Sequence, residues 1–212
     1  MKHKKQAYEN LATSIIEKFN LRGIDGYYAE SAEDALEIVQ RFFTPGCTIS
    51  WGGSQTLNEI GLIDILNVSD SDFNLLDRTA VPFDERDTFY SKVVNCDYFL
   101  MSSNAITMDG QLVNIDGSGN RVACLITGPK NVIVVAGMNK IVSDVDAGIT
   151  RVRNFAAPPN TVRLNKDTPC SHHGRCGDCL SADCICSNIV ITRRSHVPGR
   201  VKVILVGEEL GY

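Results

Sequence analysis

Hydrophobic residues recur along much of the chain at the three- and four-residue spacing of amphipathic helices. This spacing predicts one helix over residues 5–20. It predicts a second helix that begins at a capping box of Ser31 and Asp34 and ends at the "TPG" of 44–46. The same pattern predicts helices over 54–66 and 85–95, and a last one that Ser143 caps and Pro158-Pro159 stop.

Two unbroken apolar runs, "DYFLMS" at 97–102 and "NVIVVAG" at 131–137, have the composition of parallel strands buried on both faces. Polar residues or glycines bound each run. Strands that alternate with helices in this way predict an α/β fold, with a mostly parallel sheet and helices on both of its faces. Further strands are predicted at 47–51, 73–77, 188–194 and 201–207.

The composition of the chain changes only near residue 158, where apolar periodicity gives way to a region rich in Pro, Cys and His. A chain of 212 residues that is 43% hydrophobic can bury a substantial core of its own. We therefore expect a single domain over 1–212. Its C-terminal part would carry a Cys-rich extension, the cysteine segment, at 168–188.

The charges exclude some classes of partner. Lys and Arg number 21 against 25 Asp and Glu, a formal net charge of −4, so the chain carries no basic footprint for nucleic acid. The N-terminal residues lack the apolar stretch of a secretion signal, and no apolar run approaches the ~20 residues of a membrane span. We expect a cytoplasmic protein whose thiols are kept reduced, which makes disulfides the weaker interpretation of its cysteines.

A glycine-rich turn, "SWGGSQTLNEIG" at 50–61, joins a predicted strand to a predicted helix. Gly52 and Gly53 would let the backbone approach a ligand closely, and Ser54 and Thr56 would supply hydroxyls beside free backbone N–H groups. The turn is either an anion site or simply a tight turn that Ser54 caps.

A polar loop at 102–123 follows a buried strand and has two Asp-Gly turns around a short strand, "QLVNI". A hairpin would explain the turns but not the density of polar side chains, which is typical of a binding site. Lys140 follows another strand, and it is either a solvated charge or, together with Arg121, a cation for a carboxylate or phosphate. The polar side chains of the loop are Asn104, Thr107, Asp109, Asn114, Asp116, Asn120 and Arg121.

Several long stretches carry a resemblance: "GGSQTLNEIGL", "NAITMDGQLVNIDGSGNRVA", "GPKNVIVVAGMNKIV", "RVRNFAAPPNTVRL" and "GRVKVILVGEELGY". In this order they resemble the LUD-domain family, the lactate-utilisation proteins. The resemblance implies an α/β fold with a Rossmann-like core, like that of ribose-5-phosphate isomerase and the acyl-CoA transferases. It also implies action with iron–sulfur partner proteins in the oxidation of lactate to pyruvate.

The resemblance also implies site residues. The acyl-CoA transferases of this fold use a loop glutamate as nucleophile, whereas Glu59 lies inside a predicted helix, which speaks against covalent acyl transfer. The residues that match the family's motifs are Gly52, Gly53, Ser54, Thr56, Asp109, Gly110, Asn114, Asp116, Gly117, Gly119, Asn120, Arg121, Asn139 and Lys140.

Five cysteines lie within "CSHHGRCGDCLSADCIC" at 170–186, and the pair Cys176-x2-Cys179 has the spacing that zinc and iron–sulfur sites both use. In a reduced chain this cluster favours metal binding over redox chemistry or inert thiols. The resemblance implies the quartet Cys170, Cys176, Cys179 and Cys186, with Cys184 as an additional candidate and His172 or His173 as a substitute ligand. Zinc and a [4Fe-4S] cluster both suit these ligands.

Our leading hypothesis is a subunit or accessory of 2-hydroxy acid oxidation that binds a small anionic metabolite at the strand-end loops. Ser54, Asn120, Arg121 and Lys140 would orient the anion, Asp109 or Asp116 would accept a proton, and electrons would leave through the cysteines to iron–sulfur oxidoreductase subunits. The alternatives are a zinc-stabilised, non-catalytic assembly or regulatory subunit, and an isomerase or transferase of the wider fold group. We expect the binding crevice to be separate from the cysteine segment, and an oligomer is compatible with each hypothesis.

Overall fold

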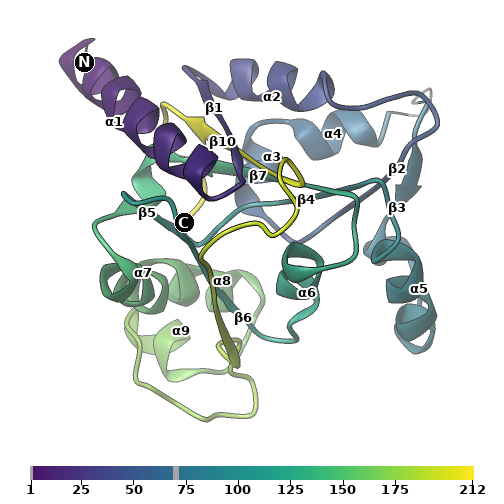
Figure 1. Ribbon diagram of the computed structural model, residues 1–212. Helices are drawn as coiled ribbons and strands as arrows, with labels where there is room; N and C mark the ends of the chain where they lie inside the picture. Colours follow the sequence, from purple (N-terminus) through teal and green to yellow (C-terminus); the bar gives the residue numbers. More distant parts are fainter. Residues whose placement is uncertain (1, 69–71) are drawn as a thin grey trace.

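The computed structural model describes residues 2–68 and 72–212, and its centre is a six-stranded, fully parallel sheet (Figure 1). The strand order is β1-β10-β7-β4-β2-β3. The predicted α/β fold with a mostly parallel sheet is therefore confirmed. The strands of this sheet are β1 (Asp25–Ala29), β2 (Thr48–Trp51), β3 (Asn74–Leu76), β4 (Tyr98–Met101), β7 (Asn131–Gly137) and β10 (Val201–Val206).

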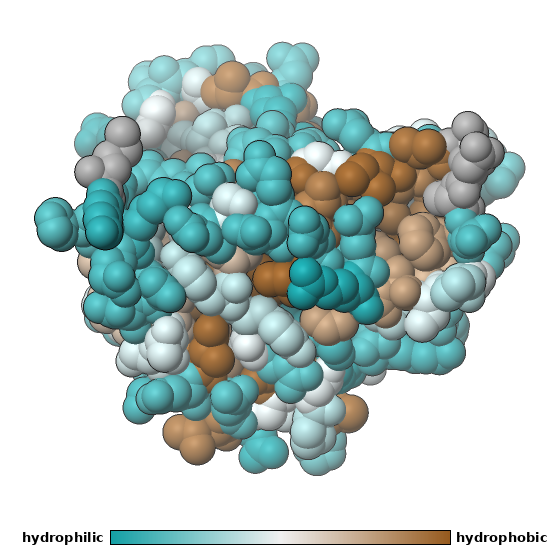
Figure 2. Space-filling model, turned by 90° about the horizontal axis from the view of Figure 1, so that it is seen from above, coloured by the Kyte–Doolittle hydropathy of each residue, from teal (hydrophilic) through white to brown (hydrophobic). Residues whose placement is uncertain are grey.

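Helices cover both faces of the sheet, because side chains along each central strand alternate between two apolar clusters. In β7, Val132 and Val134 pack in the cluster with α1, α5 and α6, whereas Ile133 and Val135 pack in the cluster with α2, α3 and α4. Figure 2 views the α2 and α4 side and shows a mostly hydrophilic outer surface, with hydrophobic side chains gathered toward its right. The helices are α1 (Lys2–Leu21), α2 (Ala32–Gln40), α3 (Gln55–Glu59), α4 (Leu62–Leu66), α5 (Arg86–Val93) and α6 (Asn120–Ile126).

A smaller four-stranded sheet, in the order β8-β5-β6-β9, packs beside the large one and carries the C-terminal helices (Figure 1, bottom). Its inner side joins the cluster under α1 through Ile106 and Leu112, and its other side packs on the helices through Val113 and Ile115. The elements of this part are β5 (Ala105–Thr107), β6 (Leu112–Asp116), β8 (Ile141–Val142), α7 (Val145–Arg151), a π-helical turn (Val152–Ala156), α8 (Ala157–Arg163), α9 (Pro169–His173) and β9 (Asn188–Thr192).

The prediction that Pro158-Pro159 stop the helix is wrong, since α8 runs through both prolines to Arg163. The prolines occupy the first positions of α8, where a backbone N–H is not needed, and the π-helical turn before them absorbs the change in hydrogen bonding. This continuation lets α8 pack against the π-helical turn and α9.

The strands of the large sheet are parallel, so the segments that follow β2, β3, β4, β7 and β10 all leave from one edge. In open α/β sheets this carboxyl edge is where ligands bind. Among the described residues, no helix is both long and apolar enough to cross a membrane.

Candidate functional site

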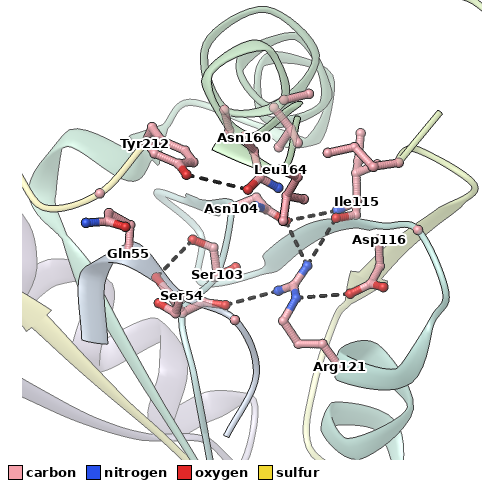
Figure 3. A pocket seen from close by; sticks show the side chains of 18 of the residues that line it. Ser54, Gln55, Ser103, Asn104, Ile115, Asp116, Arg121, Asn160, Leu164 and Tyr212 are labelled. Atoms are coloured by element: carbon pink, nitrogen blue, oxygen red, sulfur yellow. Dashed lines mark hydrogen bonds and ion pairs between the residues drawn. The ribbon is translucent and has the colours of Figure 1, made fainter. Parts of the chain in front are cut away.

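A crevice of about 270 Å³ lies at the carboxyl edge of the large sheet (Figure 3). One side is formed by the segments after the strands of the large sheet, and the other by the end of β6, the π-helical turn with α8, and the cysteine segment. Its polar lining residues are Ser54, Gln55, Thr56, Arg78, Ser102, Ser103, Asn104, Asp116, Ser118, Asn120, Arg121, Lys140, Asn160, Arg163 and Tyr212.

The glycine turn after β2 forms part of the wall. Gly53 lines the crevice, and Gly52 lies beneath it, where an added Cβ would lie 3.1 Å from the Arg121 side chain. Ser54 caps α3 by accepting a hydrogen bond of 3.3 Å from the Leu57 amide. The two interpretations of this turn are therefore compatible: Ser54 caps the helix and also lines the crevice.

Arg121 enters from α6 beside Asp116 (Figure 3) and donates all five of its guanidinium N–H bonds to neighbouring groups. Its Nε bonds to Asp116 at 3.0 Å, Nη1 to the Ser102 carbonyl and Asn114 Oδ1, and Nη2 to Asn104 Oδ1 and the Ile115 carbonyl. Burial lowers the pKa of Arg121, and Asp116 opposes this shift. Arg121 thus ties β4, β6 and α6 together, and it has no donor left for a ligand.

Asp116 lines the crevice beside Arg121 and accepts a second hydrogen bond of 2.9 Å from the Gly119 amide. Gly119 itself begins α6 with a φ of 83°, a left-handed conformation that favours glycine, and it does not line the crevice. Gly117 and Asn120 do line it, and the Asn120 amide donates to the Tyr90 hydroxyl at 2.8 Å.

Lys140 lies at the end of β7 with only 3% of its surface exposed, and it lines the crevice. Its Nζ donates to Thr56 Oγ1 at 2.8 Å and to Ser102 Oγ at 3.0 Å. Burial lowers the pKa of Lys140 to about 7, helped by Arg151 and Arg121 and opposed by Glu59. The amine therefore has a large neutral fraction near neutral pH.

The C-terminal residues close one side of the crevice. Asn139 does not line it, but its Oδ1 accepts from the Leu210 amide at 3.1 Å and its Nδ2 donates to the Gly211 carbonyl at 3.3 Å. Tyr212 then reaches α8, where its hydroxyl accepts from Arg163 Nε at 2.7 Å. Asn139 therefore acts on the crevice through the tail that it holds.

Comparison with known proteins agrees with this architecture. A family profile described as the LUD domain matches residues 12–206. The chain belongs to the LUD-domain family. A crystal structure of a DUF162 family protein from Deinococcus radiodurans, at 1.70 Å resolution, superposes with a TM-score of 0.55 and 14% identity. The match covers 94% of this chain and 98% of that one. None of the curated proteins matches the sequence.

Besides Gly52, Gly119 and Asn139, two further residues predicted for the site, Asp109 and Asn114, do not line the crevice. Asp109 is at the far end of the β5–β6 hairpin, where its carboxylate accepts from Arg22 at 2.7 Å and from Gln111 at 3.0 Å. The expectation that Asp109 shares the crevice is thereby corrected: the hairpin turn points away from the carboxyl edge. Asn114 is fully buried behind the wall, where it accepts from Arg121.

Several lining residues carry no signal in the sequence. Arg78 follows β3, and its guanidinium makes no hydrogen bond or ion pair with any residue of 2–68 and 72–212. An added Cβ at Gly53 would lie 2.8 Å from a guanidinium nitrogen of Arg78, so the glycine makes room for it. Asn160, Arg163 and Tyr212 arrive through the helix α8 and the tail, which the sequence did not place.

The expectation that the crevice is separate from the cysteine segment is wrong, because Ile185 and Cys186 form part of its wall. Burial, followed by the neighbouring Cys184, Cys170 and Cys176 thiols, raises the pKa of Cys186 to about 12. These thiols therefore gather around Cys186.

The cysteine segment has the donor chemistry of a metal site without its geometry. Four of its thiols are near one another, which suits a thiophilic metal. Within the described part of the chain, however, no three His, Cys, Asp or Glu side chains are arranged to hold one ion. Cys170 instead contacts the hydroxyls of Thr168 at 3.2 Å and Thr161 at 3.5 Å.

Proposed function

We propose that the crevice binds a small carboxylate, a 2-hydroxy acid such as lactate or the corresponding 2-oxo acid. The protein would serve as a subunit or accessory of 2-hydroxy acid oxidation. The observation that carries this proposal is the charge of the wall: four basic side chains line the crevice, Arg78, Arg121, Lys140 and Arg163, against the single carboxylate of Asp116. Arg121 pairs with that carboxylate, so three basic side chains of the lining, Arg78, Lys140 and Arg163, have no anionic partner among the described residues.

Arg78 is the residue that we assign to the carboxylate of the metabolite. Its planar fork matches a carboxylate in a two-bond contact, and no described residue uses it. Hydroxyls and amides around the remainder of the crevice, such as Ser54, Gln55 and Asn160, would orient the rest of a small polar molecule. Asp116 keeps lone pairs free beside its two hydrogen bonds and is the carboxylate that could accept a proton.

Titration calorimetry with lactate, pyruvate and the neutral analogue lactamide tests this proposal. We expect the two acids to bind and the amide to bind far more weakly. A charge-assisted hydrogen bond contributes about 1.5–3 kcal/mol, so Arg78→Ala should weaken the binding of both acids by about ten- to 150-fold. Asp109→Asn is the matched control on the distant hairpin and should bind as the wild type does. Equal affinity for the acids and the amide, or unchanged affinity in Arg78→Ala, would contradict the proposal.

A second part of the proposal concerns electron transfer through the cysteine segment, which Cys186 connects to the crevice wall. Cys170, Cys176, Cys179 and Cys186, with Cys184 as an additional ligand, would hold a [4Fe-4S] cluster or zinc. A cluster there would accept electrons for an iron–sulfur partner. Because the thiols are not arranged for coordination, they would have to turn toward one another on loading.

Anaerobic purification followed by iron, sulfide and zinc analysis separates the two metals. About four irons and four sulfides per chain support electron transfer, and about one zinc supports a structural or regulatory subunit. Cys186→Ser should lower the bound metal in either case, while Cys47→Ser, a buried thiol in a different apolar cluster, should not. Anaerobic protein that contains neither metal would contradict this part of the proposal and leave the carboxylate site standing.

A further inference from the structure

The Lys140 amine lines the crevice, yet it has no carboxylate partner among the described residues within ion-pair distance. Buried lysines are ordinarily paired, since an unpaired buried charge is costly. Here the amine is held only by two hydroxyls, from Thr56 after β2 and Ser102 after β4, which leaves one position on nitrogen open.

The charged groups around Lys140 explain why it can lose its proton. Arg151 is partly buried nearby, where it donates to the Asn104 and Asn139 carbonyls, and Arg121 lies on the same wall. Among the described residues, the nearby group that favours the cation is Glu59, whose carboxylate already accepts a hydrogen bond of 2.6 Å from the Gly211 amide. A desolvated lysine beside other cations is the arrangement that makes an amine nucleophilic.

We propose that Lys140 forms a reversible imine with a 2-oxo acid held in the crevice. This inference rests on the proposed carboxylate site and extends it to a covalent step. The neutral Nζ would add to the carbonyl carbon of the acid, and the carbonyl oxygen would become a hydroxyl. One amine proton moves to that oxygen when the C–N bond forms, and the hydroxyl leaves as water after it takes the second amine proton, so a C=N bond replaces the C=O bond and no oxidant or reductant is needed. Hydrolysis returns the acid.

The surroundings of the amine fit this step. The Thr56 and Ser102 hydroxyls lie within hydrogen-bond distance of Nζ, so they can pass protons between the amine and the departing hydroxyl. The tail covers this corner: an added Cβ at Gly211 would lie 2.6 Å from Thr56 Oγ1 and 3.2 Å from Nζ. The tail thus limits the access of water to the imine, and Arg78 would hold the carboxylate of the same molecule.

Reductive trapping tests the inference directly. Wild-type protein is incubated with pyruvate and sodium cyanoborohydride, which reduces an imine to a stable secondary amine, and the adduct is located by peptide mass mapping. We expect one adduct, on Lys140, that acetate suppresses by competing for the carboxylate site. Lys140→Met should abolish it, and Ser102→Ala should slow it without removing pyruvate binding.

Lys202 is the internal control, because burial also lowers its pKa but it does not line the crevice. Trapping should be about tenfold or more faster at Lys140, since only there is the carbonyl held beside the amine. Equal labelling of both lysines, or no adduct in protein that binds pyruvate by calorimetry, overturns the imine and leaves the proposed function intact. Protein that does not bind pyruvate at all overturns both.

Discussion

Replacing Arg121 with alanine should be among the most damaging substitutions in the crevice wall, and the structure gives the size of the effect. The guanidinium is almost fully buried, and the change would leave a buried Asp116 carboxylate without its partner. Breaking a buried ion pair in this way costs about 3–5 kcal/mol. Each neutral acceptor left without a donor adds about 1–3 kcal/mol, although this part is largely offset here.

The offset can be followed group by group. Asn114 Oδ1 also accepts from the Asn104 amide, Asn104 Oδ1 from the Ile115 amide, and Asp116 from the Gly119 amide. Water can also enter from the crevice. We therefore expect Arg121→Ala to lower the free energy of unfolding by about 3–5 kcal/mol. For a chain of this size that corresponds to roughly 6–20 °C in Tm.

Equilibrium denaturation followed by circular dichroism measures this loss, with Arg78→Ala as the matched control. Arg78 makes no hydrogen bond to the described residues, so its removal should change the free energy of unfolding by no more than about 0.5 kcal/mol. The loss in free energy of unfolding for Arg121→Lys should lie between those for Arg121→Ala and Arg78→Ala, because lysine keeps the positive charge but lacks the planar guanidinium group. A cost of Arg121→Ala below about 1 kcal/mol, or equal to that of Arg78→Ala, would refute the structural role of the five hydrogen bonds.

Three further predictions concern stability. Because the folded-state pKa of Lys140 is lowered to about 7, the wild type gains stability as pH rises from about 7 to 10. The advantage of Lys140→Met in unfolding free energy should therefore shrink by on the order of 3 kcal/mol across that window, and a constant difference would contradict this. Gly137→Ala would place a Cβ 2.6 Å from the Glu208 carbonyl and the Leu210 amide, so hydrogen exchange of the tail should accelerate; unchanged exchange argues against it. Asp109→Asn breaks a half-exposed ion pair and should cost no more than about 1 kcal/mol in thermal unfolding; a larger loss would count against the view of Asp109 as a surface residue.

The strands that the sequence predicted well are those buried on both faces. In β4, β7 and β10 nearly every side chain contacts a core cluster, so β4 and β7 appear as apolar runs and β10 as a run that only Lys202 interrupts. In contrast, β1 at the sheet edge is "DGYYA", with only Ala29 buried, and gives no such run. The short helix α6 was hidden for a different reason: it begins inside the polar loop at Asn120, and its first turn is made of site residues.

The sequence predicted the lining residues that directly follow strands. It did not predict the lining residues that reach the crevice through tertiary contacts. The turns after β2, β4 and β7 have glycines and polar residues that indicate a site, and parallel pairing brings them to one edge. Arg78 has no such context in the sequence. Tyr212 reaches the crevice only because Asn139 holds the C-terminal tail and α8 continues past Pro158-Pro159.

Arg121 and Lys140 were predicted as a pair of equivalent cations, and the structure separates their chemistry. What distinguishes them is the number of donors already used: five of five on the guanidinium, and two of three on the ammonium. A saturated guanidinium can only hold the wall in place, whereas an amine with an open position can bind or attack. The sequence gives the residue types but not the number of N–H donors that remain free. Several of the acceptors that bind these donors, such as the Ser102 and Ile115 carbonyls, are backbone groups whose positions depend on the fold.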